Sequence, residues 1–150
     1  MSNYPYPIWW DTAITIYNKY TDPNTQQVTW YRSKVDNAFW KYVYDKVTIG
    51  NTVLESNKII CRIREDANYM DKYLWVALSD ENKAKYFTLG QGDIIVKGEV
   101  TDIVNEYVSG QRSTDLIEKY KELQGCFEIQ KASNNTGAGR GLPHYLAQGI

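Results

Sequence analysis

The stretch "FTLGQGDIIVKGEV", residues 87–100, carries the residues most suggestive of chemistry, because glycine-rich loops can hold a phosphate. A dinucleotide-binding loop needs GxGxxG at the start of a helix. Gly90 and Gly92 fit its first two positions, but Ile95 takes the third and belongs to a β-branched run typical of a strand. No Gly-Lys-Ser/Thr follows, so a P-loop is excluded. We predict a tight turn with positive φ angles and a bulge at Gly98.

A second candidate loop is "NNTGAGRGLPH", residues 134–144, in which small residues surround Arg140. A phosphate there would lack the N-terminal amides of a helix, because no helix follows. We therefore expect a hairpin loop that meets a neighbouring molecule, with Arg140 as a contact. His144 lies in the alternating tail after this loop, which favours a hydrogen-bonded structural histidine over a catalytic base.

Nucleophile and metal patterns have no support in the sequence. There is no GxSxG elbow, and neither Cys61 nor Cys126 sits in a motif with His144. One histidine without a CxxC motif gives a zinc site no basis. The two cysteines lie far apart in strand-like runs, which favours buried free thiols over a disulfide.

Paired carboxylates could serve glycoside hydrolysis, and the segment 65–85 contains four acids that we considered for this role. They are Glu65, Asp66, Asp80 and Glu81. Their segment is charged and we expect it to be solvated, so the pairing is disfavoured. We predict no enzymatic activity, no cofactor and no bound metal.

The bulk composition describes one domain of 150 residues, of which 43% are hydrophobic. The net charge of -1 excludes the basic stripe of a duplex DNA binder. No apolar run approaches the roughly 18 residues of a membrane span, and the N-terminus lacks a secretory signal pattern, so we expect a protein made in the cytoplasm. The 13 Tyr and 5 Trp residues favour strands and surfaces that meet a partner.

Alternating apolar and polar residues predict a mainly β fold. We expect strands at 13–20, 28–44, 58–64, 93–100, 126–131 and 144–149, with the second broken or bent near Asp36-Asn37. A capped apolar stripe that Gly125 closes predicts one helix at about 114–124, with Ser113 or Thr114 as its cap. The whole chain, 1–150, is predicted to be one small antiparallel β-barrel or sandwich with one short inserted α-helix and long loops.

Two segments fit this alternation poorly. "KVTIGNTVLESNK", residues 46–58, is expected to be an extended loop or arm that projects from the sheet. Residues 65–85 are expected to form a long excursion with some ordered structure of its own.

The order of these elements resembles the head-completion proteins of long-tailed bacteriophages and prophages, also called head-closure, stopper or minor capsid proteins. The resemblance runs from about Trp9 to Gly149 and is best in "GDIIVKGEV" and "PHYLAQG". It implies a virion protein of the phage neck, the head-tail connector, assembled in the bacterial host cytoplasm as a homo-oligomeric ring of six or twelve copies. The segment 65–85 and the helix exceed what a minimal barrel of this family requires.

The resemblance also implies partners: a portal or adaptor protein on one face, a tail or tail-terminator protein on the other, and packaged DNA contacted non-specifically in the channel. Two alternatives stay open. One is another tail or baseplate structural protein, and the other is a cytosolic small-ligand-binding β-barrel.

A closure ring needs a loop that enters the channel, and we choose the projecting segment. The channel-loop candidates are Ile49, Gly50, Asn51, Thr52, Val53, Leu54 and Glu55. Their β-branched members are expected to pair from copy to copy. Nearby charges are mixed, so we expect DNA to be blocked sterically more than bound.

Interfaces with other copies and partners are expected to use exposed aromatic residues. Trp9 and Trp10 are adjacent in a proline-flanked segment, where an extended backbone would point them in opposite directions, one into the core and one toward a neighbour. The alternative is that both cover one end of the barrel. The rival channel loop, Asp66–Lys83, contributes three further partner contacts: Tyr69, Tyr73 and Trp75.

Overall fold

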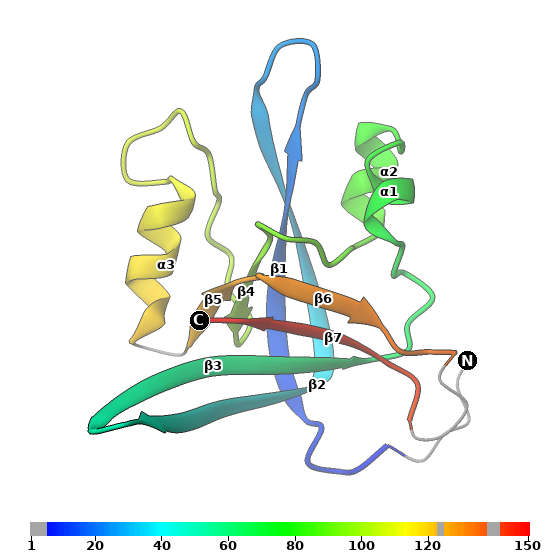
Figure 1. The fold of residues 1–150 in the computed structure, drawn as a ribbon. Coiled ribbons are helices and arrows are strands. Elements are labelled where there is room, and N and C mark those ends of the chain that lie inside the picture. The colour runs from blue at the N-terminus through cyan, green and yellow to red at the C-terminus, as the bar shows by residue number, and fades with distance from the viewer. Residues whose placement is uncertain (1–5, 123–124, 138–141) are drawn as a thin grey trace.

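The computed structural model describes residues 6–122, 125–137 and 142–150 (Figure 1), with the side chains of residues 45, 47 and 54–56 outside that description. Most of the chain forms antiparallel strands. The elements are β1 (Thr12–Thr21), β2 (Val28–Ile49), β3 (Thr52–Arg64), α1 (Lys72–Trp75), α2 (Asp80–Lys85), β4 (Ile94–Lys97), α3 (Ser113–Lys121), β5 (Cys126–Glu128), β6 (Lys131–Asn134) and β7 (His144–Gly149).

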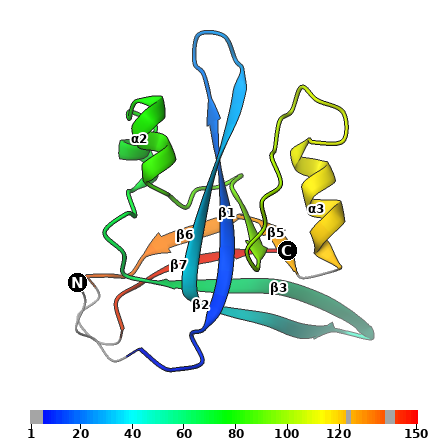
Figure 2. The same cartoon turned by 180° about the vertical axis from the view of Figure 1, so that it is seen from behind.

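The strands form one antiparallel sheet in the order β5-β4-β1-β2-β3-β7-β6, which curls into a half-barrel (Figures 1 and 2). The outermost strands, β5 and β6, are consecutive in the chain. Between them, the Ile129 N–H donates to the Asp93 carbonyl and the Gln130 N–H donates to the Gln148 carbonyl. The chain thus crosses from the β4 side of the sheet to the β7 side. The predicted mainly β, barrel-like class is confirmed.

Strand β2 is bent and changes partner along its length. It pairs with β1 up to Ala38 and with β3 from Phe39 onward. The register with β1 shifts between Thr12 and Ile14, and Asn37 has a positive φ of 61°. This β-bulge bends the strand, as the break predicted at Asp36-Asn37 required.

Strand β1 is buried on both faces, whereas its alternating pattern indicated a half-buried strand. Ile14 and Ile16 enter the main apolar cluster inside the half-barrel. Tyr17 enters a second cluster, formed with β4 and α3. The Tyr17 hydroxyl donates to the Asp102 carbonyl at 2.8 Å, and the Thr15 hydroxyl donates to the Gly98 carbonyl at 2.8 Å. Both hydroxyl groups of the second face therefore have a hydrogen-bond partner within the protein, as buried polar groups generally do.

The helices differ from the prediction in number and bounds. Helix α3 ends at Lys121, and its N-cap is Arg112, whose backbone N–H donates to the Asp115 carboxylate at 3.1 Å. Gly125, with a φ of 106°, closes its end by donating to the Tyr120 carbonyl, as predicted. Two additional short helices, α1 and α2, occupy the segment 65–85, and the Ser79 hydroxyl caps α2 by accepting from the Asn82 N–H.

The glycine stretch turns the chain into β4. Gly92 and Gly98 have φ angles of 94° and 98°, as expected for positions that only glycine adopts freely. Gly90 serves differently, because a Cβ there would lie 2.9 Å from Cδ of Lys72. Its lack of a side chain admits Lys72 to the turn.

The cysteines and the histidine have the structural roles predicted for them. Cys61 and Cys126 are free and buried, and burial raises the pKa of both thiols, that of Cys126 to about 12. His144 makes hydrogen bonds through both ring nitrogens, with the Leu142 carbonyl at 2.8 Å and the Asn135 side-chain amide at 3.2 Å.

Candidate functional site: a projecting arm and an aromatic groove

Strands β2 and β3 continue past the half-barrel as a two-stranded arm, residues 43–58 (Figure 1, extending to the left). Pairing continues without interruption to Ile49 and Thr52 at the tip. Gly50 has a φ of 61° at the first position of the two-residue turn, as a type II′ hairpin requires. Of the two forms expected here, an extended loop or an arm, the structure shows the arm, as a regular hairpin. Its β-branched residues satisfy each other's backbone groups within one chain.

Both backbone edges of the arm are open. In the part of the chain that the structure describes, β2 beyond Phe39 pairs with β3 alone, and β3 pairs with β7 only from Ile59 onward. An unpaired edge presents N–H and C=O groups to another strand. The arm can therefore add strands from another chain on either side.

The arm tip brings the channel-loop candidates together. Ile49 and Val53 are both more than half exposed there, beside Gly50, Asn51 and Thr52. The side chains of Leu54 and Glu55 lie outside the described part, although their backbone belongs to β3. The tip is apolar and has no covering element among the described residues.

Three aromatic residues form a ladder along one face of β2. Trp40, Tyr42 and Tyr44 occupy alternate positions of the strand, so their side chains share a face. Neighbouring ring centroids lie 6.4 and 6.3 Å apart, and the two tyrosine rings are nearly parallel at 15°. Phe127 anchors the ladder to the core at 5.4 Å from Trp40. The alternating "WKYVY" was the sequence signal for this ladder, but sequence reasoning gave it no role.

An open groove of about 310 Å³ lies between the root of the arm and the end of α3. Gly125 lies beside one of its lining residues, since a Cβ there would lie 2.7 Å from the Tyr42 hydroxyl. We call it the aromatic groove; it is lined by Tyr42, Tyr44, Asn57, Lys58, Ile59, Lys121, Cys126 and Ile150. Among the described residues, neither of its lysines is in an ion pair, so the groove is both aromatic and cationic.

The segment 65–85 is packed on the sheet and is not a projecting loop. Trp75 is 0% exposed and donates its indole N–H to the Tyr86 carbonyl at 3.1 Å. Tyr69 is half-buried and stacks on Tyr145 with 3.7 Å between ring centroids. The partner-contact role predicted for Trp75 is therefore wrong, and Tyr69 holds the segment to β7. Tyr73 is 72% exposed and remains available to a partner.

The two adjacent tryptophans have opposite environments, as predicted. Trp9 is 65% exposed, whereas Trp10 is 6% exposed and packs against Tyr6, Phe39 and His144. The segment is a turn, in which the Trp10 N–H donates to the Pro7 carbonyl at 3.1 Å, and it is not extended as expected.

We expect Trp10→Ala to lower the free energy of unfolding by about 3 kcal/mol, because it empties a packed aromatic site. Trp9→Ala, the matched control, should change it by no more than about 0.5 kcal/mol. Urea denaturation followed by circular dichroism measures both. Equal losses for the two variants would contradict the environments described above.

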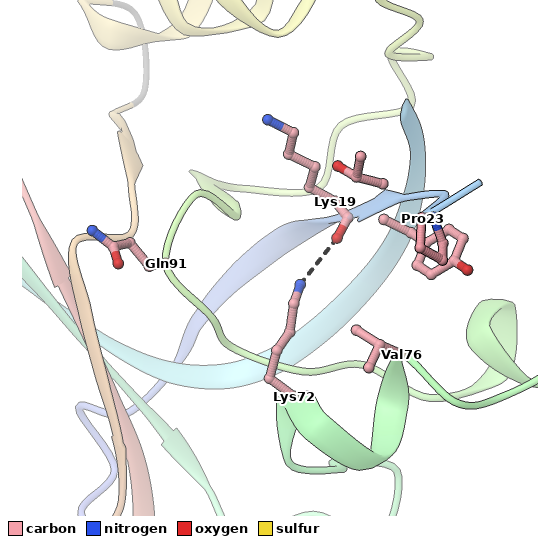
Figure 3. A pocket seen from close by; sticks show the side chains of 7 residues that line it. Lys19, Pro23, Lys72, Val76 and Gln91 are labelled. Atoms are coloured by element: carbon pink, nitrogen blue, oxygen red, sulfur yellow. Dashed lines mark hydrogen bonds between the residues drawn. The ribbon is translucent and has the colours of Figure 1, made fainter. Parts of the chain in front are cut away.

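A second cleft, of about 580 Å³, lies beside α1 and the end of β1 (Figure 3). Lys72 projects there and donates to the Lys19 carbonyl at 3.0 Å. Its ammonium also lies 3.1 Å from the Asp93 carboxylate, which is fully buried. That carboxylate further accepts from the Asn18 amide and from the backbone N–H groups of Lys19 and Gly90.

The ion pair between the buried Asp93 and the partly exposed Lys72 fixes α1 and the glycine turn to β1. Burial raises the pKa of the Asp93 carboxyl, and the Lys72 ammonium opposes that rise. Because the Lys72 ammonium is already paired with Asp93, it is not available to an anionic ligand in the cleft. We assign the pair a structural role.

The remaining candidates for chemistry are dispersed. Asp80 accepts from the Tyr31 hydroxyl at 3.0 Å, and Glu81 pairs with Lys85 on the surface of α2. Within the described ranges, no group of three His, Cys, Asp or Glu side chains could hold a metal ion. The same residues include no helix long and apolar enough to cross a membrane. Arg140 lies outside the described residues.

Comparison with known proteins gives one result. No curated protein and no solved structure matches the chain. The model of one family matches residues 9–149, which is nearly the full length. The protein therefore belongs to the family of unknown function DUF6751.

Proposed function

We propose that the protein is a structural component of the phage neck, where a ring of its copies closes the DNA-filled head and provides a docking surface for the tail. The observation that carries this proposal is the arm, a regular hairpin that projects from a filled half-barrel with both edges open. A hairpin of this kind is rigid enough to obstruct a channel. It has no evident use in a barrel that acts alone.

The arm has the dimensions of a plug element. Its strand from Val43 to Ile49 spans about 20 Å at 3.4 Å per residue. If the arms of all copies point to the ring axis, their apolar tips meet there. Their open edges then pair from copy to copy, in addition to the pairing within each hairpin.

The net charge of the protein agrees with a channel that obstructs DNA sterically and does not bind it tightly. The net charge is -1, and cationic groups that neutralise phosphates would bind DNA persistently. Contact with packaged DNA is then non-specific and steric. No enzymatic step or cofactor is needed for this role.

Docking of the head and tail partners requires exposed surface away from the arm. The loop before α3 supplies one such surface with Ile103, Tyr107 and Val108, at the end of the molecule that also carries the β1–β2 turn (Figure 1). Trp9 supplies another. These two surfaces are our candidates for contacts with the portal or adaptor protein and with the tail or tail-terminator protein.

The small-ligand-binding alternative is disfavoured by the interior of the half-barrel. Ile14, Ile16, Ile63, Ile95 and Phe127 fill that interior with fully buried side chains. A ligand would have to bind in open surface grooves instead. Another tail or baseplate protein remains the alternative within the virion.

Particles made without this protein test the proposal. Without the protein, we expect heads that fill with DNA, fail to gain tails and then lose the DNA. In wild-type particles, we expect the protein to copurify in a fixed stoichiometry. Electron microscopy and mass spectrometry of purified particles measure both. Complete, infectious particles without the protein would contradict a neck role.

A further inference from the structure

We infer that neighbouring copies in the ring join through two different surfaces, with the α1–α2 segment of one copy seated in the aromatic groove of the next. This inference rests on the proposed function, because it names the contact that closes the proposed ring. The occupant of the groove is thus a second copy of this chain.

The positions of the two surfaces suit a ring. Helices α1 and α2 lie on one side of the half-barrel, and α3 with the arm lies on the opposite side, in both views (Figures 1 and 2). Two different patches on opposite sides make a heterologous, head-to-tail contact. Contacts of that type close into rings when the rotation between copies allows it.

The α1–α2 segment presents a compact apolar knob. Trp75 is buried and Lys72 reaches the buried Asp93 carboxylate, whereas Tyr73 and Leu74 of the same turn are exposed. Tyr73, Leu74 and Val76 are all exposed. Tyrosine is among the residues that most often anchor interfaces, because it combines a large apolar ring with a hydrogen-bonding hydroxyl.

The aromatic groove is complementary to this knob in its apolar part. Its wall is the stacked pair Tyr42 and Tyr44, and Tyr44 is 72% exposed. The groove is large enough for an aromatic side chain, at about 310 Å³. Exposed rings on both surfaces lose contact with water when the surfaces meet, which is favourable.

Charge complementarity is the second argument for a copy of this chain. The groove carries Lys58 and Lys121, neither of which is in an ion pair within the described part of the chain. The first turn of α2 carries the exposed carboxylates of Asp80 and Glu81. Among the described residues, Glu81 forms an ion pair with Lys85 alone, at 3.4 Å on the surface of α2. Such an exposed ion pair contributes little to stability and can be replaced by a pair with a lysine of the neighbouring copy.

The contact would also set the direction of the arm. Tyr42 and Tyr44 belong to the root of the arm and to the groove wall at once. A neighbour seated on them would fix the arm relative to the ring axis. Assembly and closure of the channel would therefore depend on the same tyrosines.

Cysteine cross-linking tests the inference directly. Tyr44→Cys and Tyr73→Cys proteins, mixed at ring-forming concentration and oxidised, should give a disulfide-linked dimer that contains one of each. Each variant alone should give at least tenfold less. Combining both substitutions in one chain should give a ladder up to the full ring. Cys126 lines the groove, so every protein in this experiment carries Cys126→Ser, and the buried Cys61 should not react.

Ile103→Cys is the matched control, because Ile103 is 75% exposed and lies outside both surfaces. It should cross-link to neither variant. Efficient self-linking of Tyr44→Cys would overturn the inference in favour of like surfaces that pair. Linking of Ile103→Cys as efficient as that of Tyr73→Cys would overturn it as well.

Charge reversal gives a second readout. Lys121→Glu and Glu81→Lys should each weaken ring formation at least tenfold, and the two together in one chain should restore it. Native mass spectrometry follows the ring. If both single variants form the ring as readily as the wild-type protein does, this interface is wrong and the neck role is unaffected. A wild-type chain that is monomeric at every concentration and missing from particles contradicts the neck role itself.

Discussion

Shortening the arm is expected to give particles that package DNA and then lose it. The variant removes residues 46–49 and 52–55 and retains Gly50-Asn51, so that the paired residues Asp45 and Ser56 flank the same turn. The half-barrel should fold normally, because none of the removed residues with a described side chain belongs to its two apolar clusters. In the proposed ring the arm tips obstruct the channel sterically, so loss of the tips would open it.

Nuclease protection measures this result. Wild-type particles should protect the full genome, whereas particles with the short arm should protect less than a tenth of it after storage. The control replaces Ile49 and Val53 with Ser and keeps the arm at full length. It should retain DNA if length, and not apolar character, blocks the channel. Short-arm particles that keep their DNA would show that the arm is not the plug.

Replacing Asp93 with Ala is expected to lower the free energy of unfolding by about 3–5 kcal/mol. The carboxylate is fully buried and accepts from Lys72, Asn18 and backbone N–H groups. Its removal takes the acceptor from the backbone N–H groups of Lys19 and Gly90 and the counter-charge from Lys72, which costs more than the original pair contributes. The Lys72 ammonium and the Asn18 amide keep the Lys19 and Thr88 carbonyls as acceptors. The loss should appear as a lower urea midpoint with an unchanged slope.

Glu81→Gln is the control for this variant, because it removes a carboxylate from an exposed ion pair of the same charge type. It should change stability by no more than about 0.5 kcal/mol. Adding Lys72→Met to Asp93→Ala should recover part of the loss, since it removes an ammonium that has lost its carboxylate partner. A cost below about 1 kcal/mol for Asp93→Ala would contradict the role assigned to the buried pair.

Local patterns predicted six of the seven strands, because apolar and polar residues alternate in them, but β6 lies in a stretch expected to be a loop and was not predicted. The bend of β2 at Asn37 and the turn at Gly92 were also predictable, since both depend on residues that adopt positive φ angles more readily than others. The double burial of β1 was not. It depends on α3 and the preceding loop, which cover Thr15 and Tyr17 from far along the chain.

The hairpin pairing of the arm and the helices of segment 65–85 were not predicted, for related reasons. Both faces of the arm are largely exposed, so its sequence lacks the alternation that marks a half-buried strand. Helices α1 and α2 are too short to show a helical period. Sequence alone could not reveal that Trp75 turns inward while Tyr73 stays exposed. It also could not bring Lys72 to Asp93.

Reconstruction of the neck in complete particles by electron microscopy tests the central claim most directly. The proposed neck role predicts a ring of this half-barrel between the portal or adaptor and the tail. In that ring the β2–β3 arms point inward and their tips close the channel below the last ordered DNA. Arms that point outward, or density for this fold in the tail or baseplate instead of the neck, would contradict it.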